Sequence, residues 1–261
     1  MPSVRGVDVA ISDAGVGGAF FWGHGFASSK AQDARSGLLD WRHLVSRHRV
    51  VRWDARRHGE SGGTLEPADY RWDNLGLDLL GLADALAVDR FAAGGVSMGA
   101  AVALHAAVHA SHRVVGLVLI LPPTAYEMRA EQADEYLAGA AVVEQEGVDH
   151  YVERANAQPA PTILGHLAHG YRFVPAVPRQ YLPAVLRGAA ASDLPEPESV
   201  RALGTPALIL AWESDPGHPL ATAARLFELL PNAELHVARR LEDVAAWTGL
   251  VDAFLAPLSP L

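Results

Sequence analysis

Short apolar runs alternate along most of this chain with amphipathic stretches of helical periodicity. The runs rich in β-branched and aromatic residues are Val7–Ile11, Ala19–Trp22, Arg49–Trp53, Phe91–Val96, Val114–Leu121, Pro206–Trp212 and Ala233–Ala238. Helices are predicted at Leu39–His48, Asp73–Val88, Met98–His109, Pro219–Leu230 and Glu242–Leu255. This alternation predicts a mostly parallel sheet with helices on both faces, which is the doubly wound α/β class.

The alternation stops between residues 125 and 201, where helical patterns continue without a convincing strand. We interpret residues 125–201 as a helical cap inserted into a core formed by residues 1–124 and 202–261. An insertion at this point follows a predicted strand, so it would lie over the carboxyl end of the sheet. Open α/β folds bind their ligands at that end.

Composition limits the classes of partner. The chain has 261 residues, half of them hydrophobic, which suits a single α/β domain with a large core. A formal net charge of −9 argues against nucleic acid and anionic membranes as partners. Because there is no cysteine, disulfides, a thiol nucleophile and cysteine-rich metal sites are excluded. No metal-binding cluster or phosphate-loop pattern occurs, so neither a metal nor an organic cofactor is implied.

The N-terminal residues and the apolar runs show no pattern of a signal peptide or a membrane span. Residues 1–6 lack the apolar core of a signal peptide, and no apolar run approaches the roughly 18 residues of a membrane span. We therefore expect a cytoplasmic protein that acts on a small molecule. The sequence says little about oligomeric state, and a homodimer stays open.

The pentapeptide from Gly95 to Gly99 is the strongest chemical motif. It has the pattern G-x-S-x-G, with a predicted strand before Ser97 and a predicted helix after it. That context is typical of a nucleophile elbow, in which small residues allow a tight turn that lifts the serine clear of the backbone. The competing interpretation is that Ser97 only caps the helix. The glycines, the strand and the helix together favour the elbow.

Two loops at the same sheet end complete the predicted site. Gly25 follows the second predicted strand and would let backbone N–H groups face Ser97. In an acyl-transfer enzyme, the N–H groups of Phe26 and Met98 would then form an oxyanion hole. The polar loop from Asp54 to Ser61 leaves a buried strand, and we interpret it as a scaffold in which Asp54 binds backbone N–H groups.

These residues together resemble the α/β-hydrolase superfamily, in the branch of esterases, C–C bond hydrolases and cofactor-free haloperoxidases. The resemblance covers nearly the whole chain and rests on His24-Gly25-Phe26, the Asp54–Ser61 loop, the Ser97 elbow, the cap and the segment from Trp212 to Asp215. In that family the catalytic acid follows the strand after the cap. The resemblance therefore implies Asp215 as the acid, with Glu213 as a weaker candidate.

The family places its catalytic histidine after the last strand, and this chain has no histidine beyond His236. A serine hydroxyl needs a base within hydrogen-bond reach. His218, three residues after Asp215, ranks first as that base, and His236 ranks second. The remaining candidates are His24 and the cap histidines His150, His166 and His169.

The favoured hypothesis is a serine hydrolase that cleaves an ester or related carbonyl bond of a small, largely apolar substrate. Its specificity would come from cap side chains such as Tyr126, Met128, Tyr136, Tyr171 and Phe173. Two alternatives stay open, the first of them motivated by the missing histidine after the last strand. One is a lyase, isomerase or cyclase that forms no covalent intermediate, and the other is a ligand-binding member of the fold without catalysis.

Overall fold

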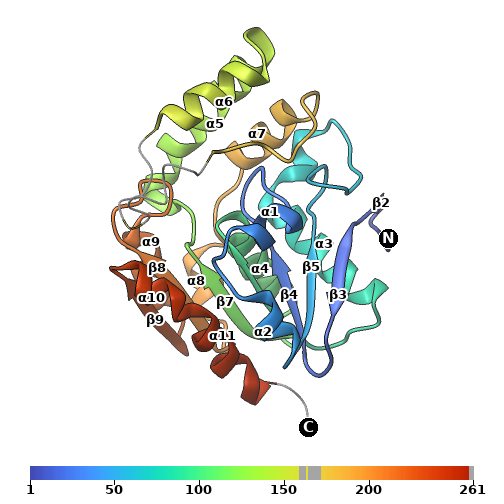
Figure 1. Cartoon of the computed structure of the whole chain (residues 1–261), viewed down its shortest axis with the longest axis vertical. Coiled ribbons are helices and arrows are strands. Elements are labelled where there is room, and N and C mark those ends of the chain that lie inside the picture. Colours follow the sequence, from blue (N-terminus) through green and yellow to red (C-terminus); the bar gives the residue numbers. More distant parts are fainter. Residues whose placement is uncertain (159–162, 164–171, 259–261) are drawn as a thin grey trace.

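One seven-stranded sheet forms the centre of the molecule (Figure 1). The computed structural model describes residues 1–158, 163 and 172–258. The strand order is β3-β5-β4-β6-β7-β8-β9, with β3 antiparallel to β5 and all other neighbours parallel. The strands are β3 (Ile11–Ala14), β4 (Ala19–Gly23), β5 (Arg49–Trp53), β6 (Phe91–Val96), β7 (Val114–Ile120), β8 (Ala207–Trp212) and β9 (Ala233–Ala238).

Helices cover both faces of this sheet because successive side chains of each buried strand point to opposite sides. Phe21 of β4 packs in one apolar cluster, together with side chains of α3 (Trp72–Ala85), α4 (Met98–His109) and α9 (Leu220–Leu229). Phe20, its neighbour, packs in a second cluster that contains side chains of α2 (Trp41–Val45) and α11 (Trp247–Leu255). The doubly wound, mostly parallel α/β fold predicted from the sequence is therefore confirmed.

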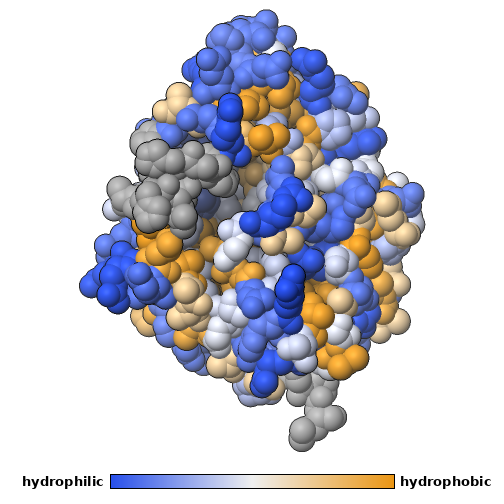
Figure 2. Space-filling model, viewed as in Figure 1, coloured by the Kyte–Doolittle hydropathy of each residue, from blue (hydrophilic) through white to orange (hydrophobic). Residues whose placement is uncertain are grey.

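The described residues between 125 and 201 contain helices and no strand. They are η2 (Tyr126–Met128), α5 (Arg129–Gln145), α6 (Val148–Ala157), α7 (Leu182–Ala190) and α8 (Pro197–Arg201). Side chains of α5 and α7 form a third apolar cluster with Ala27 and with Tyr70 of η1 (Pro67–Tyr70). Helices α5 and α6 extend beyond the sheet (Figure 1), and hydrophobic residues gather over α7 in the same view (Figure 2). The division into a core and a cap stays a prediction.

Two predicted elements are wrong in detail. The expected strand Val7–Ile11 is interrupted, because β2 (Val7–Asp8) pairs with β1 (Ser3–Val4) across a turn with positive φ at Arg5 and Gly6. The first strand of the seven-stranded sheet is therefore β3. The expected helix Glu242–Leu255 is two helices, α10 (Leu241–Ala245) and α11, which meet at Ala246. A further short helix, α1 (Lys30–Arg35), was not predicted.

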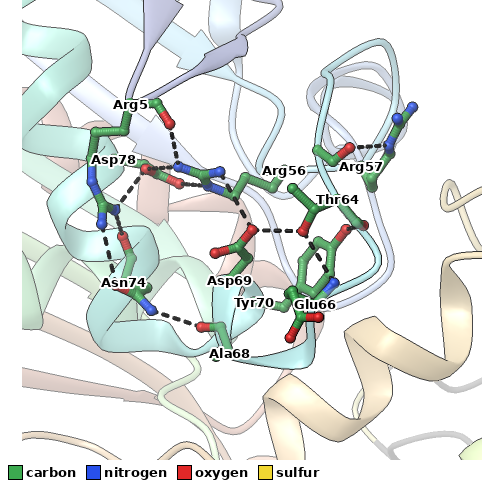
Figure 3. A network of polar contacts seen from close by, with 11 residues as sticks. Arg5, Arg56, Arg57, Thr64, Glu66, Ala68, Asp69, Tyr70, Asn74 and Asp78 are labelled. Carbon is green, nitrogen blue, oxygen red and sulfur yellow. Dashed lines mark hydrogen bonds and ion pairs between the residues drawn. The ribbon is translucent and has the colours of Figure 1, made fainter.

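A buried ion network ties the N-terminal hairpin to the loop after β5 (Figure 3). Asp78 of α3, whose side chain is 1% exposed, accepts hydrogen bonds from Arg56 Nη2 at 2.8 Å and from Arg5 Nη1 at 2.9 Å. Arg5 also donates to the backbone oxygen of Asn74 at 2.8 Å. Because a buried carboxylate needs compensating donors, this network fixes the start of the Asp54–Ser61 loop against α3.

Candidate active site

Ser97 lies at the turn between β6 and α4 with φ 54° and ψ −115°. This left-handed backbone region is costly for a residue with a side chain, and such strain is typical of a nucleophile elbow. Gly95 and Gly99, two residues before and after Ser97, leave room for this tight turn. A Cβ on Gly99 would lie 2.1 Å from the backbone oxygen of Gly23, and one on Gly95 would lie 2.3 Å from the carbonyl carbon of Gly99. The tight approach of α4 to β4 therefore requires both glycines.

His218 contacts Ser97 directly. Its Nε2 lies 2.9 Å from Ser97 Oγ, and its Nδ1 lies 2.9 Å from Asp215 Oδ2. Asp215 and His218 both belong to the loop between β8 and α9, whereas Ser97 comes from the β6–α4 turn. The structure thus brings together the three residues predicted from the sequence as nucleophile, base and acid. The imidazole of His218 lies between the serine hydroxyl and the carboxylate, as a nucleophile activated by an oriented base requires.

Asp215 is held in its charged form. Burial raises the pKa of this carboxyl group, but the hydrogen bond and electrostatic interaction with His218, together with the donors on Trp212 and Gly217, lower it more. The net result is a pKa below the usual range. The distances are 2.7 Å from Trp212 Nε1 to Oδ2 and 3.0 Å from Gly217 N to Oδ1. Glu213, the weaker candidate, pairs instead with Arg239 at 3.1 Å on the surface.

The predicted oxyanion-hole residues lie beside the elbow. A Cβ built on Gly25 would be 3.8 Å from Ser97 Cβ, so the backbone after β4 runs next to the serine. Met98 is the first residue of α4, where N–H groups have no acceptor within the helix. Within the described part of the chain, the N–H groups of Phe26 and Met98 donate to no other group. Their role in binding an oxyanion stays a prediction.

The other candidate histidines described lie in different environments. His24 is buried, and its Nε2 accepts the N–H of Ala55 at 3.1 Å. The ring proton therefore sits on Nδ1, and the lone pair of Nε2 is occupied by this hydrogen bond. Burial also lowers the pKa of His24. His236 is paired with Glu234 at 3.6 Å, and His150 with Glu146 at 3.3 Å on the exposed face of α6. His166 and His169 lie outside the described residues.

Asp54 has the scaffold role expected of it. Its carboxylate accepts the N–H groups of Lys30 at 2.7 Å and Glu60 at 3.0 Å, and it binds Lys30 Nζ at 2.8 Å. Lys30 is the only lysine of the chain. Its role has no signal in the sequence, because α1, the helix that begins at Lys30, is too short to show a helical period.

The cap side chains predicted to set specificity lie in different environments. The ring of Tyr136 packs against that of Phe26 at a tilt of 46°, with centroids 5.0 Å apart, next to the predicted oxyanion hole. Phe173 packs on Tyr151, a residue that the sequence analysis did not single out, and the Tyr126 hydroxyl donates to Pro195 O at 3.2 Å. Met128 is 38% exposed. The candidate Tyr171 falls outside the residues that the structure describes.

A cavity of about 360 Å³ lies at the opposite, amino end of the strands. Its walls include Gly18, Phe91 and Leu258, and no residue of the Ser97 site contributes to it.

Comparison with known proteins agrees with this fold. The model of the alpha/beta hydrolase family matches residues 18–247, and the chain belongs to that family, a family of enzymes. No curated protein matches the chain.

Solved structures of similar fold include three hydrolytic enzymes. A thermophilic esterase from Thermogutta terrifontis is 21% identical with a TM-score of 0.80, the match covering 98% of this chain and 96% of the esterase. An enol-lactonase from Burkholderia xenovorans LB400 is 19% identical with a TM-score of 0.74, covering 97% and 98%. A meta-cleavage product hydrolase from Pseudomonas fluorescens IP01 is 21% identical with a TM-score of 0.67, covering 98% and 97%.

Proposed function

We propose that this protein is a serine hydrolase that cleaves an ester or related carbonyl bond of a small, largely apolar substrate. The observation that carries the proposal is the continuous chain of hydrogen bonds from Ser97 Oγ through the His218 ring to Asp215, with both links at 2.9 Å. A hydroxyl in contact with an imidazole that a carboxylate orients is the arrangement that activates a serine nucleophile.

The geometry supports the following steps. Ser97 Oγ attacks the substrate carbonyl carbon while His218 Nε2 takes the hydroxyl proton, and Asp215 stabilises the resulting imidazolium. The N–H groups of Phe26 and Met98 bind the negatively charged oxygen of the tetrahedral intermediate. His218 then gives the proton to the leaving alcohol, which leaves an acyl group on Ser97. Water, deprotonated by His218, releases the acid and restores the hydroxyl.

The apolar character of the substrate is proposed from the cap. The Phe26–Tyr136 contact places aromatic surface beside the predicted oxyanion hole, and a hydrophobic wall of this kind favours an apolar acyl or alkyl group. The proposal keeps the sequence-based expectations of a small-molecule substrate and a cytoplasmic location. The esterase, the lactonase and the C–C bond hydrolase among the similar structures are in keeping with a carbonyl substrate.

The alternatives without a covalent intermediate were motivated by the missing histidine after β9. The His218–Ser97 contact removes that motive. The test is hydrolysis of p-nitrophenyl acetate and longer p-nitrophenyl esters by the wild type and Ser97→Ala. We expect turnover by the wild type and a loss of at least about a thousandfold in the variant. Substantial turnover of the same ester by folded Ser97→Ala would contradict covalent catalysis, and no turnover of any ester by the wild type would contradict the esterase assignment.

A further inference from the structure

Trp212 contacts the acid of the proposed triad from the sheet. It is the last residue of β8, and its indole Nε1 donates to Asp215 Oδ2 at 2.7 Å. The same oxygen accepts the Nδ1 proton of His218 at 2.9 Å. One carboxylate oxygen therefore receives two N–H donors, one from the proposed base and one from a residue of the sheet.

The indole itself is rigidly held. Trp212 is 7% exposed and stacks on Trp247 of α11, with ring centroids 5.9 Å apart and an angle of 24° between the planes. Trp247 is 1% exposed and lies in the apolar cluster between the sheet and α11. The backbone of Trp212 is also paired in the sheet, opposite Ala238 of β9. The donor is thus fixed by a strand and a helix rather than by a loop.

The other two donors to Asp215 do not tie its carboxylate to the sheet. Gly217 N and His218 Nδ1 belong to the same β8–α9 loop as Asp215, so they move with it, whereas Trp212, also three residues from Asp215, belongs to β8. The β8–α9 loop includes Ser214 at φ 63°, a strained backbone position. Ser97, in contrast, is anchored to the sheet, where its N–H donates to Ile120 O at 3.0 Å. Only a donor that is itself anchored to the sheet can align the loop with the serine.

We infer that Trp212 is a positioning residue, whose indole N–H ties the Asp215–His218 loop to the sheet and so aims His218 at Ser97. This inference rests on the proposed function. In this arrangement the hydrogen bond from Trp212 fixes Asp215 relative to β8. His218, three residues from Asp215, can therefore contact Ser97 in the turn after a different strand, β6.

The test compares Trp212→Phe with a protein that carries 3-benzothienylalanine at position 212, in which sulfur replaces the N–H and the ring size is kept. The matched control is Trp22→Phe. Trp22 lies on β4, is 1% exposed, and its Nε1 donates to the buried Asp33 at 3.0 Å, outside the proposed triad. All three variants lose one indole-to-carboxylate hydrogen bond, but only the two at position 212 lose it at Asp215.

We expect both position-212 variants to lower kcat for a p-nitrophenyl ester by about tenfold with little change in KM, because a hydrogen bond to a charged group is lost. The acidic limb of the pH–rate profile should move to higher pH. A carboxylate with one donor fewer is a better acceptor and holds the protonated imidazole more strongly. Trp22→Phe should lose stability and keep the kcat and the pH profile of the wild type.

A measurement that needs no turnover separates this inference from the proposed function. With one donor fewer on Asp215, the NMR signal of the His218 Nδ1 proton should move downfield in both position-212 variants and stay in place in Trp22→Phe. An unchanged signal and an unchanged pH profile at position 212, or equal changes in Trp22→Phe, would overturn the inference. A wild type without esterase activity would overturn the proposed function alone, because the NMR signal still reports the Trp212 contact. If Trp212→Phe does not fold, the benzothienylalanine protein decides the question.

Discussion

Asp215 and His218 face each other at 2.9 Å, from Oδ2 to Nδ1, although only two residues separate them in the chain. The loop after β8 therefore supplies both members of the pair. The turn after β9 supplies neither, since α10 begins at Leu241, three residues after the strand ends. The three residues of the proposed triad consequently come from two connections, the β6–α4 turn for Ser97 and the β8–α9 loop for its partners.

Removal of the proposed base should abolish most of the activity. His218→Ala leaves Ser97 without a proton acceptor, so kcat for a p-nitrophenyl ester should fall by about a hundred- to ten-thousandfold. His236→Ala is the control, because that side chain is 41% exposed and paired with Glu234 rather than with Ser97. Equal losses in both variants, or none in His218→Ala, would refute the assignment of His218 as base.

The elbow should tolerate no side chain at Gly99. A Cβ there meets the backbone oxygen of Gly23 at 2.1 Å, and backbone cannot move aside as a flexible side chain can. Gly99→Ala should therefore lower the free energy of unfolding by about 3 kcal/mol or more.

Urea denaturation measures this effect, and Gly249→Ala is the matched control. Gly249 lies in α11 with no atom within 4 Å of the added Cβ. Alanine should raise the stability there by up to about 1 kcal/mol through helix propensity. A Gly99→Ala protein as stable as the wild type would contradict the close contact between the backbones of β4 and α4 at Gly23 and Gly99.

The elements with strong periodicity were predictable from the sequence, and so was the elbow. The pattern around Ser97 needs only glycines, a strand and a helix, all of which are local. The N-terminal hairpin was missed because β1 and β2 have two residues each and show no period. The ranking of His218 first came from its place after β8, but its contact with Ser97 depends on the fold, since the two lie 121 positions apart in the chain. The Trp212–Asp215 hydrogen bond also has no sequence signature.

The buried ion network should contribute strongly to stability. Asp78→Ala leaves the buried Arg56 guanidinium without its carboxylate, which should cost about 3–5 kcal/mol of unfolding free energy. Asp73→Ala removes a pair with Arg71 in which both side chains are more than a third exposed, and it should cost less than about 1 kcal/mol. Chemical denaturation compares the two, and a similar small loss in both would contradict the role given to Asp78.

Asp33 should make stability depend on pH near neutrality. Burial raises the pKa of this carboxyl group from 3.8 to about 7, against the lowering effects of the Trp22 hydrogen bond and the charge of Arg52. The folded state then binds a proton that the unfolded state has released, so stability falls as the pH rises from about 4 to about 7.

Asparagine at position 33 keeps an acceptor for the indole N–H of Trp22 and carries no charge. Asp33→Asn should thus be more stable than the wild type at pH 8, by up to about 4 kcal/mol, and about equally stable at pH 4. Thermal or urea unfolding at the two pH values measures the difference. A gap between variant and wild type that is the same at pH 4 and pH 8 would refute the raised pKa.

The proposed mechanism requires that Ser97 is a nucleophile activated by His218. A fluorophosphonate probe tests it directly, because the phosphorus forms a bond to an activated serine oxygen as fluoride leaves. Labelled protein is digested, and mass spectrometry identifies the modified residue. We expect stoichiometric labelling of Ser97 in the wild type, none at that site in Ser97→Ala, and labelling slowed by at least about a hundredfold in His218→Ala. A wild type that stays unlabelled at high probe concentration, or that is labelled at the same rate without His218, would contradict it.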